Sequence, residues 1–449
     1  MTSSLKKLAV KGSAWTIMGY GSSQLLRFAS NIVLTRLLIP EYFGVMALVN
    51  AFRQGLELFS DIGIAQNIVR SKRGDDPEFL NTAWSISILR GLLLWAVLVL
   101  LAYPISRFYE EPLLFNVLIV ISIVTIARGL VSTKIYTLNR HLVIGKVTLF
   151  EFASQFVGVV TMVFVAWLYP SIWSLVIGAI VGQTFRSVLS YILFPGHQHK
   201  FVIQPEARKE IVSFGRWIFL SSIVMFLADQ SDRLILGDKV SLRTLGVYNI
   251  AYMFASIPQQ VMKQMSFKVI FPIVSKRVDL PRKQLKRKIN RQLWKLHSVL
   301  ILMCLGLAGF GDLIINFLYD SRYQEAAWMM PLLALGSWFS ALFFIADPCL
   351  LALGKSFYSA QSRVFRLVLI MVGIHVGFAR YGILGAIAVV ALADLPSYVA
   401  SQYYLHREGL GSVLTDMKST AVLVGLIALV FWIRSMVGLG LPFDKLPTL

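Results

Sequence analysis

The chain alternates long apolar segments with short polar connections. A segment of about 20 mostly apolar residues is long enough to cross a bilayer as a helix. Thirteen segments meet this criterion, so we predict thirteen transmembrane helices and an all-α, polytopic membrane protein. The predicted helices comprise residues 12–38, 41–68, 81–103, 113–136, 147–168, 171–194, 212–237, 244–270, 293–317, 325–352, 356–378, 382–406 and 418–438.

Composition and charge agree with a membrane protein. Hydrophobic residues make up 57% of the chain and charged residues only 15%, whereas a soluble domain carries roughly 25% charged residues. The net charge of +20 is concentrated in short loops on one side of the predicted helices, above all in residues 275–295. Because positive loops stay in the cytoplasm, we predict a cytoplasmic N-terminus. Anionic lipid headgroups explain the charge of this loop better than a specific partner does, and no nucleic acid is expected.

The two halves of the chain resemble each other. The tripeptide FGV at 43–45 follows the first predicted helix as LGV at 245–247 follows the seventh. FYE at 108–110 precedes the fourth helix as LYD at 318–320 precedes the tenth. Parallel repeats of this kind are a recurring transporter plan, with the substrate held between the halves. The predicted domains are an N-terminal six-helix bundle (1–195), a cytoplasmic linker (196–211), a C-terminal six-helix bundle (212–408) and an additional C-terminal helix with a tail (409–449).

Several lysines and arginines lie near the middle of predicted helices. A charge at the centre of a bilayer costs at least about 2.5–3.5 kcal/mol, so such residues usually face a protein interior or a water-filled cavity. We therefore predict a basic cavity whose occupant is an anion. Arg27 is the first candidate ligand because its own helix offers no carboxylate within reach, and Arg90 and Lys263 follow for the same reason.

Carboxylates accompany some of these cations. Arg53, Glu57 and Asp61 are spaced i, i+4, i+8, which places them on one face of the predicted helix 41–68. Two interpretations remain open. The residues form a structural ladder of ion pairs, or a carboxylate holds the arginine and exchanges it for substrate or a proton during transport. Asp232 and Arg233 lie near the outer end of helix 212–237, where a gate or cap is as reasonable as a ligand site.

Two later positions also carry candidate chemistry. Arg366 lies deeper in helix 356–378 than Arg363, which we expect to extend to the lipid phosphates, so Arg366 is the better candidate for binding a headgroup. Asp394 lies near the middle of helix 382–406, and Pro396 is expected to kink that helix. A carboxylate beside a kink is a candidate coupling residue.

The chain carries no motif for catalysis or for metal binding. It has no phosphate-binding lysine loop, no zinc-ligand spacing and no nucleophile elbow. We therefore expect no enzyme activity, no catalytic residue and no bound metal or organic cofactor. Energy for transport is expected from a gradient of H⁺, Na⁺ or the substrate, or from a partner.

Local sequence strings resemble a known family. LTRLLIPEYFGVMALVNAF at 34–52 and DIGIAQNIVR at 61–70 are similar to Wzx-type polysaccharide-export flippases, and FPIVSKR at 271–277 resembles their second half. These proteins belong to the multidrug/oligosaccharidyl-lipid/polysaccharide exporter superfamily, and the resemblance covers about residues 5–410. It implies movement of an undecaprenyl-pyrophosphate-linked oligosaccharide from the inner to the outer leaflet of the bacterial cytoplasmic membrane.

The resemblance also implies an architecture and a binding site. Family members have twelve to fourteen helices in two six-helix bundles, which form a V around a central cationic cavity and alternate its opening. Arg27, Arg53, Arg90 and Lys263 are the candidates for the basic cleft by position. A polysaccharide polymerase and a chain-length regulator are the candidate protein partners, together with membrane lipids.

Other functions fit the pattern less well. A multidrug or cation exporter of the same superfamily is expected to have an acidic cleft, whereas cations outnumber carboxylates at the deep positions here. A lipid II flippase is expected to have the same fold and the same basic cavity, but typically fourteen helices. A membrane-embedded glycosyltransferase or polymerase is expected to have a long outer loop with catalytic carboxylates, and a scaffold would leave the deep cations unexplained.

We predict that Arg27→Ala abolishes transport while the protein still inserts into the membrane. The measurement is the exposure of a lipid-linked oligosaccharide on the far leaflet of vesicles that contain the purified wild-type or variant protein. Normal transport by the variant would show that Arg27 is not an essential ligand.

Overall fold

The computed structural model describes residues 3–141, 143–193, 199–444 and 446. Every regular element in these residues is a helix, which confirms the predicted all-α fold. The chain forms two compact units, Met1–Ile223 and Val224–Leu449. The predicted linker 196–211 lies partly outside the described residues, and Pro205 onward is already helical.

The first unit is built from antiparallel helices whose starts are marked by local sequence signals. Pro40, Pro77 and Pro112 occupy first turns, where proline costs no hydrogen bond. The Asp76 side chain caps one of these helices by accepting from the backbone N–H of Glu78. The helices are α1 (Ser3–Leu37), α2 (Pro40–Phe59), α3 (Ile64–Arg70), α4 (Pro77–Phe108), α5 (Pro112–Ile121), α6 (Ile123–Gly129), α7 (Lys134–Arg140), α8 (Ile144–Leu168), α9 (Ile172–Ile192) and the start of α10 (Pro205–Lys239).

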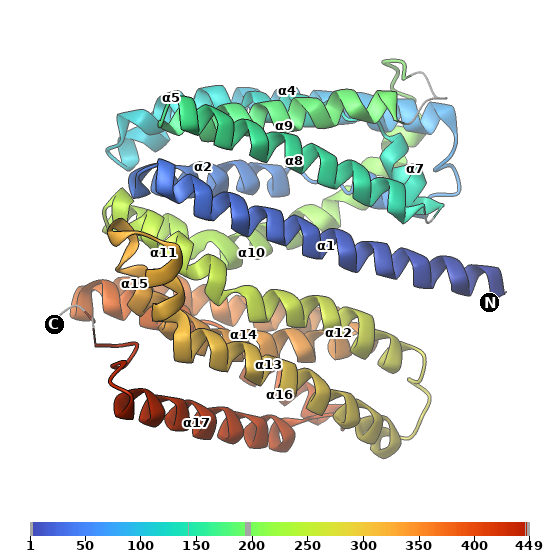
Figure 1. The fold of residues 1–449 in the computed structure, drawn as a ribbon. Helices are drawn as coiled ribbons and strands as arrows, with labels where there is room; N and C mark the ends of the chain where they lie inside the picture. The colour runs from blue at the N-terminus through green and yellow to red at the C-terminus, as the bar shows by residue number, and fades with distance from the viewer. Residues whose placement is uncertain (1–2, 142, 194–198, 445, 447–449) are drawn as a thin grey trace. The chain divides into compact units, whose positions relative to one another are not determined.

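Helices α8 and α9 pack along each other, and α1 packs along α8 (Figure 1). Glycines allow the close approach of α8 and α9. A Cβ atom added to Gly182 would lie 2.9 Å from the Cα atom of Gly158, which is closer than two carbon atoms can pack. Small residues at such contacts are the usual means of bringing membrane helices together.

The second unit is arranged around α14 (Ala326–Ala352). This helix is buried over most of its length and packs against the five neighbours α11 to α13, α15 and α16. The remaining helices are α11 (Leu242–Ala255), α12 (Ile257–Ser275), α13 (Arg282–Leu318), the short 3₁₀ helix η1 (Ser321–Tyr323), α15 (Ser356–Leu392), α16 (Leu395–Arg407) and α17 (Val413–Met436). Helix α17 packs on α13 (Figure 1).

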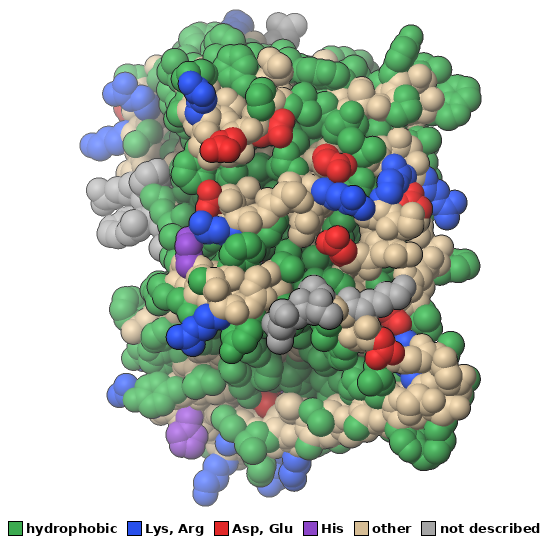
Figure 2. Space-filling model, turned by 90° about the vertical axis from the view of Figure 1, so that its left-hand side faces the viewer, with side chains coloured by type: hydrophobic (Ala, Val, Ile, Leu, Met, Phe, Trp, Pro, Cys, Tyr) green, Lys and Arg blue, Asp and Glu red, His purple; other side chains and the backbone are tan. Residues whose placement is uncertain are grey.

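The surface is that of a membrane protein. Large apolar side chains such as Leu100 and Phe317 are 75% and 83% exposed. Figure 2, which looks at one end of the helices, shows hydrophobic side chains interspersed with charged and other polar ones. Exposed apolar surface of this extent is stable only in contact with lipid or a partner. In the described part of the chain, eight helical stretches are long and apolar enough to span a bilayer: Pro77–Phe108, Pro112–Gly129, Ile144–Leu168, Ile172–Ile192, Arg282–Leu318, Ala326–Ala352, Ser356–Arg407 and Val413–Met436. The count of thirteen stays a prediction.

Several predicted helices are interrupted. Helix 41–68 was expected to be continuous, but α2 ends at Phe59 and α3 begins at Ile64. The Asp61 carboxylate accepts the backbone N–H of Gly63 at 2.9 Å, and Gly63 has a positive φ of 64°. This turn replaces helical hydrogen bonds, and glycine adopts its conformation without strain. Likewise, helix 113–136 is divided among α5, α6 and α7, and helix 244–270 between α11 and α12.

A buried ion pair joins α17 to α13 in the second unit. The Arg434 guanidinium donates to both carboxylate oxygens of Asp312 at 2.8 and 2.6 Å, and to the carbonyls of Gly309 and Gly440. Arg434 is only 2% exposed. Breaking such a pair leaves an uncompensated charge in the interior.

We predict that Arg434→Ala and Asp312→Ala each lower the free energy of unfolding by about 3–5 kcal/mol. Replacement of both residues by Met and Leu should cost less than either single change, since no charge is left buried. Unfolding in detergent measures the effect, with the exposed Arg380→Ala as the matched control. A double variant as unstable as the two single losses added together would contradict this account.

Candidate functional site

Two adjoining cavities lie within the first unit. The arginine-lined cavity, of about 590 Å³, is bordered by Arg53, Arg90, Arg128 and Arg186 on α2, α4, α6 and α9. The amide-lined cavity, of about 390 Å³, is bordered by uncharged polar residues of α1, α2, α8 and α9, namely Ser23, Asn50, Ser154, Gln155 and Gln183. Arg53 and Arg186 border both, so the two cavities adjoin each other.

One carboxylate holds two of the arginines. Glu57 accepts from the Arg53 guanidinium at 2.6 Å across one helical turn, as the i, i+4 spacing predicts. Its second oxygen accepts from Arg128, which reaches it from α6. The Glu57 side chain is only 12% exposed, whereas that of Arg128 is 53% exposed. The pair therefore has a buried acceptor and a donor that still faces the cavity.

Arg90 binds the end of α2. Its Nε donates to the Ser60 hydroxyl at 2.8 Å, and its Nη2 donates to the backbone carbonyl of Glu57. These groups lie at a helix C-terminus, where the unpaired carbonyls carry partial negative charge. Asp61 was expected on the same helix face as Glu57, which is wrong because α2 has already ended. The turn nevertheless brings Asp61 to the same cavity, 4.0 Å from Arg90.

The arginine-lined cavity carries an excess of positive charge. Its four guanidinium groups face the carboxylates of Glu57 and Asp61, and Arg186 is also paired with Glu151 on α8. Four arginines against three carboxylates leave an excess of one positive charge. Planar guanidinium groups form bidentate hydrogen bonds with phosphate and carboxylate oxygens, and they remain charged at any physiological pH. The cavity is therefore suited to an anion with several oxygen atoms.

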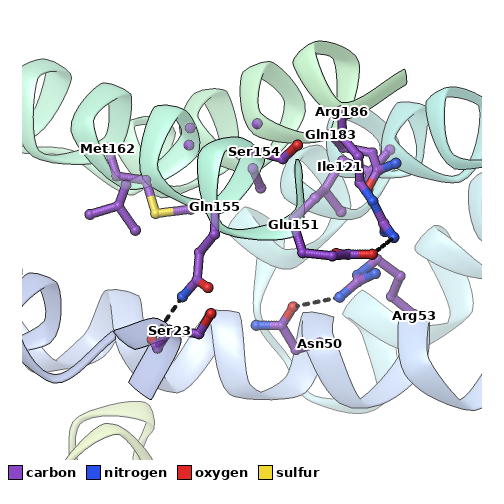
Figure 3. A pocket seen from close by; sticks show the side chains of 16 residues that line it. Ser23, Asn50, Arg53, Ile121, Glu151, Ser154, Gln155, Met162, Gln183 and Arg186 are labelled. Atoms are coloured by element: carbon purple, nitrogen blue, oxygen red, sulfur yellow. Dashed lines mark hydrogen bonds and ion pairs between the residues drawn. The ribbon is translucent and has the colours of Figure 1, made fainter. Parts of the chain in front are cut away.

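The amide-lined cavity has a different character, shown in Figure 3. Gln155 on α8 donates to the backbone carbonyl of Ser23 on α1 at 3.0 Å. Arg186 on α9 donates to Glu151 on α8 at 2.5 Å. The side-chain nitrogen of Gln183 and the Nε of Arg186 are buried without an acceptor among the described residues.

Two predicted ligands lie away from these cavities. Arg27 on α1 is exposed, forms no ion pair with any described residue and lines neither cavity. Lys263 on α12 is half-buried in the second unit, with its Nζ 5.2 Å from the centre of the Phe344 ring. A cation over an aromatic face is a favourable contact that leaves the charge uncompensated. Their assignment as ligands stays a prediction.

Arg366 and Asp394 meet inside the second unit. The Arg366 guanidinium donates to Asp394 at 2.5 Å and to the backbone carbonyl of Ala228 at 2.9 Å, and the Ser340 hydroxyl also donates to Asp394. Arg366 and Asp394 are 7% and 4% exposed. Asp394 was expected in mid-helix. It instead follows the end of α15 and precedes α16, because Pro396 occupies the first turn of a new helix.

Asp232 and Arg233 have separate neighbours. The Tyr248 hydroxyl donates to Asp232 at 2.5 Å, and Asp232 is fully buried. Arg233 donates to Gln230 at 2.6 Å and stacks over Tyr252, 5.1 Å from the ring centre. None of these contacts supplies an opposite charge, and the Oδ1 of Asp232 and the Nε of Arg233 are buried without a hydrogen-bond partner among the described residues. Whether the residues form a gate stays a prediction.

Sequence reasoning left four site residues unassigned. Arg128 and Arg186 lie within the predicted helices 113–136 and 171–194, so both are cations inside apolar segments, but neither was predicted to be a ligand. Gln155 and Gln183 are polar residues within mostly apolar helices, which was the available indication that they face a polar interior. No cluster of metal-ligand type occurs among the residues that the structure describes.

Comparisons with known proteins identify relatives over most of the chain. Residues 33–328 match the family described as polysaccharide biosynthesis protein. The chain is 23% identical over 430 residues to the lipopolysaccharide biosynthesis protein WzxC of Escherichia coli (strain K12), covering 91% of this chain and 83% of that one. It is 24% identical to the succinoglycan biosynthesis transport protein ExoT of Rhizobium meliloti (strain 1021), covering 73% and 66%.

A solved structure shares the fold. The structure of the lipid II flippase MurJ in an inward closed conformation superposes with a TM-score of 0.72 and 14% sequence identity, covering 95% of this chain and 98% of that one. At this identity the likeness concerns the fold alone.

We predict that Glu57→Gln lowers the free energy of unfolding by about 1.5–3 kcal/mol, because the charge shared by Arg53 and Arg128 is lost while the shape is kept. Denaturation in detergent measures this. The control is Glu206→Gln, whose side chain is 83% exposed and whose change should stay within about 0.5 kcal/mol. Equal losses in the two variants would show that Glu57 does not hold the arginines together.

Proposed function

The chain belongs to the polysaccharide biosynthesis protein family, and on this premise we propose that it is a flippase for an undecaprenyl-pyrophosphate-linked oligosaccharide. The substrate is an exopolysaccharide or O-antigen repeat unit, which moves from the inner to the outer leaflet of the bacterial cytoplasmic membrane. The protein acts as a transporter and makes or breaks no covalent bond.

The observation that carries the proposal is the excess of guanidinium groups in a cavity inside a membrane-embedded unit. A pyrophosphate diester keeps its negative charges at neutral pH, and its oxygens match the planar guanidinium groups. The attached glycan is hydrated and cannot cross hydrocarbon without a polar path. A cavity that neutralises the charge supplies that path while the prenyl tail stays in lipid.

The relatives support the substrate class. They are named for the biosynthesis of lipopolysaccharide and the transport of succinoglycan, and the solved structure that shares the fold is named a lipid II flippase. A drug or cation exporter is the second candidate function. A cationic substrate would be repelled by the excess positive charge of the arginine-lined cavity.

We propose that transport proceeds by alternating access and is coupled to an H⁺ or Na⁺ gradient. Glu57 is the candidate exchange group in the first unit, because a phosphate that binds Arg53 and Arg128 competes for the same donors. Asp61, Asp232, Arg233 and Asp394 remain further candidates for coupling or gating. A polymerase and a chain-length regulator remain candidate partners, while the exposed basic start of α13 is assigned to anionic lipid headgroups.

The test is flipping by purified protein in vesicles. Wild-type protein should expose a lipid-linked oligosaccharide on the far leaflet, and Arg128→Gln should slow this about tenfold or more, since a charge-assisted hydrogen bond is lost. The matched control is Lys283→Gln, which removes an exposed charge at the start of α13 and should flip at the wild-type rate.

Insertion and folding are checked in the same samples by detergent size-exclusion chromatography and thermal unfolding. Absence of flipping by the wild-type protein, together with export of small organic cations, would assign the chain to the drug exporters instead. Equal rates in Arg128→Gln and Lys283→Gln would remove the arginine-lined cavity from the transport path.

A further inference from the structure

The two cavities of the first unit present different chemistry. In the arginine-lined cavity, charged groups dominate. In the amide-lined cavity, Arg186 is paired with Glu151 and Arg53 with Glu57, so the local charges are largely balanced. What remains is a set of amide and hydroxyl groups on α1, α2, α8 and α9, beside apolar side chains such as Val159 and Met162. Such a lining favours a neutral, hydrogen-bonding ligand over an anion.

Several of these groups have unused hydrogen-bonding capacity. The side-chain nitrogen of Gln183 and the Nε of Arg186 find no acceptor among the described residues. A buried donor without a partner costs about 1–3 kcal/mol. The Gln155 amide nitrogen is bound to Ser23, but its carbonyl oxygen accepts from none of the described residues.

Unused donors and an unused acceptor therefore border the same space (Figure 3). The side chains of Gln155 and Gln183 come from the facing helices α8 and α9. A hydroxyl group both donates and accepts a hydrogen bond. Neighbouring hydroxyl groups on one ring can accordingly use a carbonyl oxygen and an N–H donor together, which neither a phosphate nor an apolar ligand can do.

The size of the amide-lined cavity and its position beside the arginine-lined cavity also fit a sugar. The volume of about 390 Å³ lies within the range of roughly 300–1,000 Å³ typical of small-molecule pockets. Because Arg53 and Arg186 border both cavities, the anionic end and the hydroxyl-rich end of one ligand would lie in neighbouring cavities. We propose that the amide-lined cavity binds the sugar residues next to the pyrophosphate, with Gln155 and Gln183 as the residues that recognise their hydroxyl groups. This inference rests on the proposed function and adds a division of the site into a phosphate part and a sugar part.

The test compares binding of three probes to purified protein. They are the lipid-linked oligosaccharides extracted from the cells that produce the protein, undecaprenyl pyrophosphate without a glycan, and the glycan released from the extract by mild acid. The variants Gln155→Met and Gln183→Met keep the side-chain length and remove the amide. Gln264→Met, at an exposed position of α12 that borders neither cavity, is the matched control.

We expect Gln155→Met and Gln183→Met to weaken binding of the oligosaccharide-bearing lipid about 3- to 10-fold and to leave undecaprenyl pyrophosphate within about twofold. Arg128→Gln should weaken both lipids and leave the free glycan unchanged. Gln264→Met should bind all three probes as the wild type does.

Equal weakening of both lipids by the glutamine variants would show a structural role and overturn the inference, as would wild-type binding of both lipids in every variant. If the wild type binds the two lipids equally, the glycan makes no contact and the inference fails while the flippase proposal stands. If the wild type binds neither lipid, the proposed function itself fails.

Discussion

The structure depends on the cost of placing charges inside a bilayer. Such a charge is stable only when the protein supplies a partner or a wet cavity. The chain meets this requirement with ion pairs that join separate elements, such as Arg434 with Asp312 between α17 and α13, and Arg366 with Asp394 at the α15–α16 junction. The same pairs that compensate the charges therefore also hold the helices in register.

The cavities of the first unit are where this compensation is incomplete. Glu57 serves two arginines, and the end of α2 serves a third. The early end of α2 matters here, because it turns carbonyl groups and Asp61 toward Arg90 instead of continuing a helix. The arginine-lined cavity is left with an excess of positive charge, whereas the adjoining amide-lined cavity is nearly neutral. The two cavities therefore favour ligands of different chemistry.

Hydropathy predicted the all-α membrane fold, and local strings predicted the family, both of which are confirmed. The Arg53–Glu57 contact also followed from helical spacing. The break after Phe59 was not predicted, although Asp61 and Gly63 are residue types favoured in turns. The side chain of Asp61 forms the turn that ends the helix. Contacts such as Arg128 with Glu57, 71 residues apart, depend on how each helix is rotated about its axis, which hydropathy does not determine. For the same reason Arg27 ranked above Arg128 and Arg186.

The most direct test of the central claim, that the cavities of the first unit receive the substrate headgroup, is photo-crosslinking in vesicles. The probe is a lipid-pyrophosphate-linked glycan with a photoreactive group on the sugar nearest the pyrophosphate, and adducts are mapped by mass spectrometry. We expect adducts on α2, α8 and α9, competed by unlabelled lipid-linked glycan. Competed adducts found only on segments that border neither cavity would contradict the account.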